Sequence, residues 1–268
     1  PLFVDKNNKE AMYVSSVSGR VSKIIFGKRR IVESILIDND KKYNSLDSIK
    51  TISKDTLLKS GLWTLIRQKP FSKVPNSNSS PRSFFISSIP TAPFAINNEF
   101  LFKNIENYLQ YGIDVLQKIF SCDINMVVAN NSSFSNLKNV NFYKFNQLHP
   151  SGNVGVQIHH IDPIKDANDT RWYLSLQDLN RIGEYFHNNT YSNIKYYSIG
   201  GNAIDNPGYY KTIIGTPINK IVNSNKGSSR YISGDVLSGK EITNNLSIDY
   251  HEDVLSVIET HNKRDFIG

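Results

Sequence analysis

Residues 148–164 read LHPSGNVGVQIHHIDPI and contain three of the six histidines in the chain. Two glycines, Gly152 and Gly155, stand at the start of an apolar run from Val154 to Ile161, and Asp162-Pro163 ends that run. This pattern predicts a glycine loop that leads into a strand beside a ligand-facing turn. The spacing Gly152-x-x-Gly155 is by itself a weak phosphate-binding signal, because a third glycine and a following helix are not expected here.

The histidines of this stretch do not make a convincing metal site. His159 and His160 are adjacent, and neighbouring side chains on a strand point to opposite faces of the sheet. His160, Asp162 and His149 form the alternative ligand set, but their spacing supplies neither the ligand number nor the geometry that metals require. We therefore predict hydrogen-bonded structural histidines and no metal site.

Composition indicates an ordinary soluble chain of one to three domains. The 268 residues are 39% hydrophobic and 21% charged, which is enough to form a buried core. No apolar run is long enough for a membrane-spanning helix, and no signal peptide is visible. The first residue is Pro1 and the sequence that follows resembles a strand, so we expect an internal fragment that lacks both ends of its subunit.

Cysteine and charge narrow the possible cofactors and partners. The single cysteine, Cys122, excludes an internal disulfide and a cluster held by this chain's own cysteines, and it follows an apolar run, so we expect it to be buried. The net charge is +7, but the basic residues are scattered apart from Lys28-Arg29-Arg30 and Lys41-Lys42. We therefore predict no nucleic-acid partner.

The first forty residues alternate apolar and polar side chains between glycines, which predicts short antiparallel strands. The segment from Met12 to Ile25 resembles the second half of a barrel-sandwich domain of the biotinyl or lipoyl type. No lysine stands at a hairpin tip in the pattern of those carriers, so we expect no carried cofactor.

The middle of the chain alternates helical and strand patterns, which predicts an α/β layer with a parallel sheet. Helices are expected over Ser53–Arg67, Phe100–Phe120 and Arg171–Phe186, and strands over Phe84–Ile89, Ile124–Ala129 and Val140–Phe145. The last part, which includes strands at Ile194–Ile199 and Val254–Glu259, resembles a β-grasp module of the soluble-ligand-binding type.

The predicted fold class is therefore multidomain α/β. The expected domains are a partial barrel-sandwich region at 1–42, a Rossmann-like α/β domain at 43–192, a β-grasp module at 193–240 and a C-terminal strand segment at 241–268. We leave open whether that last segment returns to an earlier domain.

Several blocks resemble the NqrA family of the Na+-translocating NADH:quinone reductases, in the same order. The most specific is Arg67 to Pro75, with the pattern Arg-x-x-Pro-Phe-Ser-x-x-Pro. The others are Pro1–Lys6, Gly61–Thr64, the 148–164 stretch, Leu176–Phe186, Ile232–Gly234 with Leu237–Gly239, and Arg264–Phe266.

This resemblance implies a peripheral subunit on the cytoplasmic side of the bacterial inner membrane, in a six-subunit, sodium-pumping complex. It implies FMN, FAD and a 2Fe–2S centre on other subunits, contact with the membrane surface through partners, and quinone as this subunit's ligand. The Rossmann-like part also resembles the complex I flavoprotein subunit, whose glycine loop approaches the flavin phosphate. Here Leu62 to Lys69 follow Gly61 with bulky side chains, so we expect no tightly bound flavin.

The resemblance makes Trp63, Arg67, Phe71, Lys73 and His149 candidate quinone-binding residues. Arg67 and Lys73, together with Lys69, would face an anionic partner or stabilise negative charge on a quinone oxygen. The aromatic rings would pack against the quinone, and His149 would hydrogen-bond it. Gly152 and Gly155 would form the adjoining loop. The structural alternatives are a solvated basic loop for the cations, core packing for Trp63 and Phe71, and a structural role for His149. No catalytic residue is predicted, so catalysis would belong to the complex.

Three other functions stay open. The chain could be a scaffold that binds only protein partners. It could be the C subunit of the related ferredoxin-linked electron transport complex, which the cysteine count disfavours. It could also be a soluble flavin or nucleotide enzyme, which a bound flavin spectrum would reveal.

Overall fold

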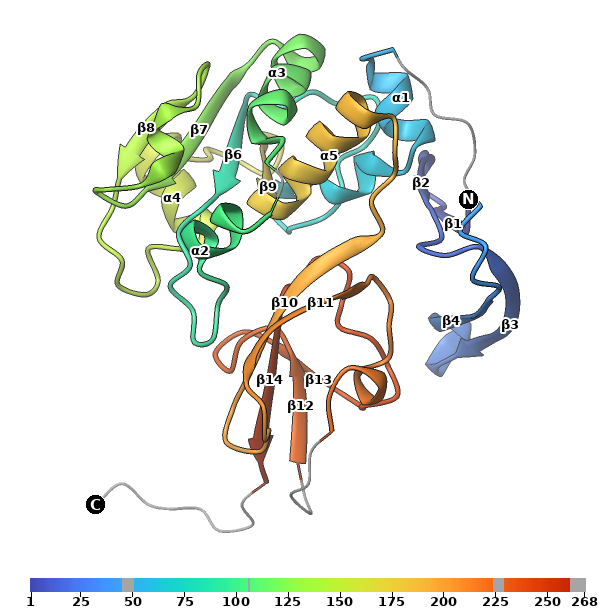
Figure 1. Cartoon of the computed structure of the whole chain (residues 1–268). Helices are drawn as coiled ribbons and strands as arrows, with labels where there is room; N and C mark the ends of the chain where they lie inside the picture. The colour runs from blue at the N-terminus through green and yellow to red at the C-terminus, as the bar shows by residue number, and fades with distance from the viewer. Residues whose placement is uncertain (45–50, 106, 224–228, 261–268) are drawn as a thin grey trace, which may run out of the picture. The chain divides into compact units, whose positions relative to one another are not determined.

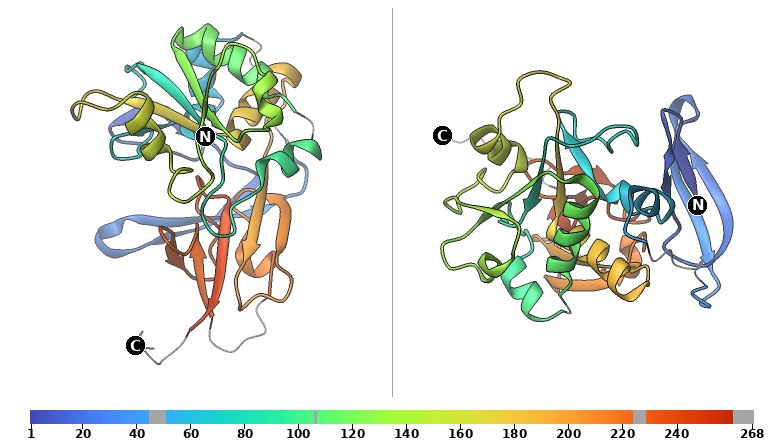
Figure 2. Two further views of the ribbon diagram at one scale, coloured as in Figure 1. Left: turned by 90° about the vertical axis from the view of Figure 1, so that its left-hand side faces the viewer. Right: turned by 90° about the horizontal axis from the view of Figure 1, so that it is seen from above.

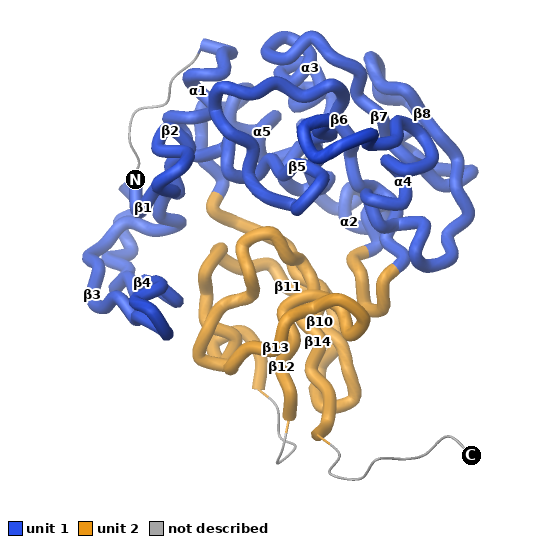
Figure 3. Tube along the Cα trace, turned by 180° about the vertical axis from the view of Figure 1, so that it is seen from behind, with its two compact units in different colours: residues 1–91, 97–192 blue, residues 92–96, 193–268 orange. Residues whose placement is uncertain are grey.

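The computed structural model describes residues 1–44, 51–105, 107–223 and 229–260 and divides into two compact units. The first unit comprises residues 1–91 and 97–192, and the second comprises residues 92–96 and the chain from Asn193 onward (Figure 1 and Figure 3). Within the described residues, no helix is long and apolar enough to cross a membrane.

The first unit is built on a five-stranded sheet with the order β5-β9-β6-β7-β8. These strands are β5 (Arg67–Lys69), β6 (Ser83–Ser87), β7 (Asp123–Val128), β8 (Asn141–Lys144) and β9 (Arg171–Ser175). Four of them run parallel, and β5 pairs antiparallel to β9 at one edge. The prediction of a parallel sheet alternating with helices is confirmed.

Helices cover both faces of this sheet (Figure 2). The helices that contact the sheet are α3 (Leu109–Phe120), α4 (Val154–Ile161) and α5 (Leu176–Asn188). The first unit also contains α1 (Lys54–Lys59), α2 (Asn98–Lys103) and the 3-10 turns η1 (Lys28–Arg30), η2 (Leu62–Leu65) and η3 (Ser133–Asn136). Phe120 at the end of α3 packs against Phe84 and Trp172 on one face. Tyr173 points to the opposite face, which α4 covers.

Helices α3 and α5 approach each other closely because glycines lie at their contact. A Cβ on Gly183 would lie 2.1 Å from the carbonyl oxygen of Tyr108, and a Cβ on Gly112 would lie 2.5 Å from that of Leu179. The backbones can touch only without side chains at these positions. Asn180 strengthens the contact by accepting the Tyr108 N–H at 2.7 Å.

Two antiparallel ribbons precede the sheet. The first pairs β1 (Phe3–Asp5) with β2 (Asn8–Tyr13), and the second pairs β3 (Gly19–Phe26) with β4 (Val32–Asn39). Asn8 joins the first ribbon to the α/β part, because its side chain donates to Pro75 O and accepts from the Ser77 N–H. Bulges in β3–β4 keep apolar pairs such as Phe26 with Val32 on one face, and both of these side chains are exposed.

The second unit is a five-stranded sheet with the order β11-β10-β14-β12-β13. Its strands are β10 (Ile194–Gly200), β11 (Gly208–Ile213), β12 (Ser229–Ser233), β13 (Lys240–Ile242) and β14 (Val254–Glu259), with a 3-10 turn η4 (Ile218–Lys220). The sheet covers an apolar core that includes Ile199, Ile218 and Leu255. Strand β14 pairs with β10 and β12, so the described part of the 241–268 segment completes this sheet.

Three predicted helices are wrong in extent. The helix over Ser53–Arg67 ends at Lys59, because Gly61 adopts a left-handed φ of 78° and begins a 3-10 turn. The helix over Phe100–Phe120 is two helices, and Asn104 ends the first. The predicted helix over Arg171–Phe186 starts with strand β9, and α5 begins only after Ser175, whose side chain caps it by accepting the Asp178 N–H.

The strand predicted over Val154–Ile161 is helix α4. Asn153 is its N-cap, and the Asn153 carbonyl accepts the N–H groups of Val156 and Gln157. Gln157 is fully buried, which the apolar alternation does not indicate. Gly155 therefore lies in the first turn of a helix, outside the predicted loop.

Candidate functional site

The block Arg67 to Pro75 forms a tight hairpin at the edge of the first unit's sheet. The Gln68 N–H donates to Lys73 O at 2.8 Å and closes the hairpin. The Lys69-Pro70 peptide is cis, and Phe71 and Ser72 have left-handed φ angles of 74° and 49°. The chain reverses direction here, because the Gln68 and Lys73 backbones pair, and the Phe71 side chain at the tip is exposed.

Two cations hold the hairpin through Ser72. The Arg67 Nε and Nη2 both donate to the Ser72 carbonyl, at 3.1 and 2.8 Å. Lys69 Nζ donates to Ser72 Oγ at 2.6 Å. Both cations also lie 5.7 Å from the ring centroid of Tyr173, on the neighbouring strand β9. The serine of the Arg-x-x-Pro-Phe-Ser pattern is thus the residue that brings the two charges together.

The positive charge of this hairpin is not neutralised by the residues that the structure describes. Within the described residues, no carboxylate forms an ion pair with Arg67, Lys69 or Lys73. Burial, and after it the charge of Arg67, lower the pKa of Lys69. Phe71 is 76% exposed beside these cations, and Lys73 is also exposed. The hairpin therefore presents an exposed aromatic ring next to unpaired positive charge.

Trp63 does not belong to this surface. It is fully buried on the opposite face of the sheet, where its ring lies 5.3 Å from that of Trp172 in an edge-on contact. Its Nε1 donates to Pro75 O at 2.9 Å. Trp63 therefore holds the end of the hairpin through a buried hydrogen bond, and it is a core aromatic residue, as the structural alternative predicts.

His149 and Gly152 lie at a different place, beside Thr91 after strand β6. The Gly152 N–H donates to Thr91 Oγ1 at 3.0 Å, and His149 Nδ1 lies 3.4 Å from the same oxygen. A Cβ on Gly152 would lie 2.6 Å from Ile89 O, so glycine allows the loop to approach this backbone. In the described part of the chain, no hydrogen bond, ion pair or ring contact joins His149 to the hairpin.

Gly155 does reach the hairpin. The position of its Cβ would lie 3.8 Å from Lys69 Cε, which places the first turn of α4 beside the half-buried lysine. Of the predicted residues, the structure brings together Arg67, Phe71, Lys73 and Gly155. Lys69, which the sequence also indicated beside Arg67 and Lys73, belongs to the same group of residues. Sequence reasoning did not select Tyr173 as a site residue, although the alternation of side chains along β9 could have indicated it.

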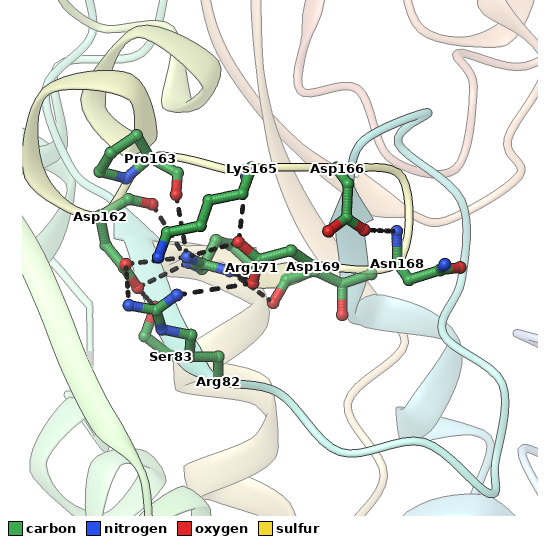
Figure 4. A network of polar contacts seen from close by, with 10 residues as sticks. Arg82, Ser83, Asp162, Pro163, Lys165, Asp166, Asn168, Asp169 and Arg171 are labelled. Carbon is green, nitrogen blue, oxygen red and sulfur yellow. Dashed lines mark hydrogen bonds and ion pairs between the residues drawn. The ribbon is translucent and has the colours of Figure 1, made fainter.

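The ending Asp162-Pro163 belongs to a polar network around Arg171 (Figure 4). Arg171 is fully buried and forms ion pairs with Asp162 and Asp169. Arg82 lies 3.3 Å from Asp162, and Ser83 Oγ donates to Asp162 Oδ2 at 2.8 Å. The hydrogen bond from Arg171 lowers the pKa of Asp169 to about 2. Arg82 and Arg171 are both paired with Asp162 and Asp169, so these ion pairs fix the loop between α4 and β9.

The histidines at the end of α4 do not form a metal site with their neighbours. Among the residues that the structure describes, no group of three or more His, Cys, Asp or Glu side chains could hold a metal ion. His159 and His160 are exposed, and the His160 ring contacts Phe145. Cys122 is half-buried, and burial raises its pKa to about 11.

Three family profiles together match most of the chain. Residues 1–40 match the NqrA N-terminal barrel-sandwich hybrid domain, residues 49–191 match the NqrA second alpha/beta domain, and residues 198–244 match the NQRA C-terminal domain of the SLBB type. The block Arg264–Phe266, which also suggested this family, lies outside the described residues.

Individual relatives agree with these profiles. The chain is 30% identical to the NqrA protein of the Na(+)-translocating NADH-quinone reductase of Haemophilus influenzae (strain PittEE), over 100% of the chain and 63% of that protein. It is 32% identical to the corresponding protein of Saccharophagus degradans, over 90% of the chain and 57% of that protein. The chain thus spans less than two thirds of these relatives.

A solved structure resembles the fold. A chain of an NAD+-reducing [NiFe]-hydrogenase in the H2-reduced state superposes with a TM-score of 0.52 and 10% identity, over 77% of this chain and 47% of that one. At this identity the likeness concerns the fold alone. The profile over residues 49–191 covers more than half of the chain, and on that evidence the chain belongs to the NqrA family.

Proposed function

We propose that this chain acts as part of a sodium-pumping NADH:quinone reductase, as the names of its relatives suggest. The other subunits of that complex would be its partners, on the cytoplasmic side of the bacterial inner membrane. The finer fold assignments belong to the same proposal. Parallel strands β6 to β9 alternating with helices support a Rossmann-like domain, and the mixed sheet from β10 to β14 supports a β-grasp module.

We propose that the chain carries no redox centre of its own. The single cysteine cannot supply the ligands of a 2Fe–2S cluster. Leu62, Trp63 and Leu65 are buried in the turn after Gly61, where the complex I flavoprotein subunit has its glycine loop. Side chains that fill this turn leave no room for a flavin phosphate against the backbone. FMN, FAD and the cluster would then lie on other subunits.

The contribution of this chain would be to bind quinone at the hairpin face. The observation that carries this proposal is Phe71, which is 76% exposed beside Arg67 and Lys73, two cations that form no ion pair among the described residues. An exposed ring suits stacking against a quinone, and fixed positive charge stabilises the negative charge that develops on its oxygens during reduction. His149 is left out of this site because it lies beside Thr91.

A titration with a soluble short-chain ubiquinone tests this assignment. Fluorescence of Trp63 and Trp172 would report binding, and saturable quenching at micromolar quinone is expected. Phe71→Ala should weaken binding about tenfold, because it removes about 1.5 kcal/mol of apolar burial. Leu148→Ala is the control, since Leu148 is 72% exposed but lies outside the hairpin. Equal affinity of the two variants would contradict the placement of quinone at the hairpin, and no saturable binding by the folded protein would favour the scaffold function.

A further inference from the structure

The turn between β3 and β4 brings apolar side chains and positive charge together. We name residues 26–32, which read Phe26-Gly27-Lys28-Arg29-Arg30-Ile31-Val32, the ribbon tip. In the described chain β3 and β4 pair only with each other, and Phe26 pairs with Val32 where the ribbon meets its turn. Phe26, Ile31 and Val32 are 58%, 64% and 49% exposed. Large apolar side chains of the tip thus face water, which favours their burial against an apolar partner.

The cations of the ribbon tip are not neutralised by the described residues. Among those residues, none of the side chains of Lys28, Arg29 and Arg30 forms an ion pair or a hydrogen bond. The nearest acidic residue in the sequence is Glu33, which follows the tip, and its carboxylate lies where a Cβ on Gly27 would be. The tip therefore offers a run of cations to negative charge outside the described chain.

The backbone of the turn does not explain why arginine stands there. The Lys28 carbonyl accepts the Ile31 N–H at 3.3 Å, and the two central residues, Arg29 and Arg30, have left-handed φ angles of 56° and 59°. Hairpin turns with two such residues favour Asn-Gly, because a β-carbon destabilises the left-handed conformation. Two arginines are thus unfavourable for the turn itself. Their charge is better explained by a contact that they make outside the ribbon.

We propose that the ribbon tip docks directly on the surface of an anionic lipid bilayer. The three apolar side chains enter the boundary between headgroups and acyl chains, and the three cations lie at the lipid phosphates. A nucleic acid would use the cations but would leave Ile31 and Val32 uncovered, and a protein interface is depleted of charge at its apolar core. The inference goes beyond the proposed function, because it requires neither quinone nor another subunit, whereas the family resemblance implies membrane contact through partners.

Co-sedimentation of the whole chain with vesicles tests the proposal in the absence of quinone. Vesicles of phosphatidylcholine with about 30% phosphatidylglycerol should bind the chain at least about tenfold more tightly than pure phosphatidylcholine vesicles, and added salt should weaken this binding. The double variant Arg29→Asn/Arg30→Gly suits the turn and removes two cations, so its binding should be about 25-fold weaker while folding is retained.

A matched double variant separates the tip from the general positive charge of the chain. Lys41→Asn/Lys42→Gln removes the same charge just beyond the other end of the ribbon, where Lys41 also has a left-handed φ of 60°. Strand β3 alone separates the two ends by about 20 Å, which exceeds the Debye length of about 10 Å at 0.1 M salt. This control should therefore bind anionic vesicles almost as well as the unchanged chain.

Insertion of the apolar side chains needs its own measurement. Fluorescence of Phe26→Trp should be quenched by lipids brominated in their acyl chains, above the small signal of the buried Trp63 and Trp172 in the unchanged chain. Ile31→Gln should weaken binding to anionic vesicles about tenfold.

Four results would overturn the proposal. They are no binding of the folded chain to anionic vesicles, full affinity of folded Arg29→Asn/Arg30→Gly, an equal loss in the Lys41→Asn/Lys42→Gln control, and binding of Phe26→Trp without quenching. Circular dichroism verifies folding of each variant. Because these experiments contain no quinone and leave the Phe71 hairpin unchanged, their failure leaves the quinone assignment standing.

Discussion

The contact between helices α3 and α5 gives a sharp test of the packing. Gly183→Ala would place a Cβ 2.1 Å from Tyr108 O and 2.8 Å from Gly112 N, both of which are backbone atoms. Carbon and oxygen need about 3.3 Å, so the helices must separate by about 1 Å. Overpacking of this kind costs about 1–3 kcal/mol, and immobile backbone places this case at the upper end. Alanine regains about 1 kcal/mol of helix propensity, which leaves a net loss of about 2 kcal/mol.

A matched substitution separates this clash from the general effect of replacing a helical glycine. Gly155→Ala lies in the first turn of α4, and its nearest neighbour, Lys69 Cε, is at an ordinary contact distance of 3.8 Å. Alanine there should be neutral or stabilise by up to about 1 kcal/mol, because only helix propensity changes. The two variants should therefore differ by about 2–3 kcal/mol in the free energy of unfolding.

Urea unfolding followed by tryptophan fluorescence measures this difference in the right part of the molecule. The only two tryptophans, Trp63 and Trp172, are both buried in the first unit. The midpoint for Gly183→Ala should lie about 1 M below that for Gly155→Ala. A Gly183→Ala midpoint equal to that of the unchanged protein would refute the backbone contact. An equal fall in both variants would attribute the loss to something other than the helix crossing.

Two further predictions concern titratable groups. The hydrogen bond from Arg171 lowers the pKa of Asp169 from 3.8 to about 2, so the contribution of this carboxylate to stability is complete above about pH 4 and is lost as the pH falls toward 2. Urea midpoints measured across that window should therefore fall less steeply for Asp169→Asn, and identical slopes would contradict the role of the ion pair. Burial and then Asp123 raise the pKa of Cys122 to about 11, so roughly one thousandth of it is thiolate at pH 8. Ellman's reagent should react much more slowly with the folded protein than with the protein in urea. A similar rate in both states would show that the Cys122 thiol is accessible to solvent in the folded protein.

Helix α4 shows where a sequence pattern stops being informative. Val154, Val156 and Ile158 alternate as in a strand, but Val154, Ile158 and Ile161 also follow the spacing of a helix. An eight-residue apolar segment fits both periods, and its β-branched residues favour the strand. The deciding feature is the buried Gln157, whose side chain bonds to the preceding loop. Burial of a polar residue depends on tertiary contacts, which local alternation does not encode.

Strand β9 is wrongly predicted as the start of a helix for a related reason. Leu174, Leu179, Ile182 and Phe186 fit one helical face, and this spacing favours a helix that starts at Arg171 although Trp172 and Tyr173 favour strands. The true boundary is Ser175, three residues before Asp178, which is a recognisable capping pair. The parallel sheet itself is predictable, because its central strands are short apolar runs that follow one another between helices.

The pattern Arg67 to Pro75, the most specific of the family blocks, has a physical explanation in the fold. Ser72 accepts hydrogen bonds from both Arg67 and Lys69. The Pro75 carbonyl accepts hydrogen bonds from Trp63 Nε1 and Asn8 Nδ2. The hairpin is therefore held at its base by buried partners, while its tip is held by groups that carry charge. Neutral partners would serve folding as well at the tip as they do at the base. Arg67 and Lys69 carry like charges, and no carboxylate in the described chain pairs with them, so ion pairing does not stabilise the tip; this supports the proposal that the tip binds a ligand.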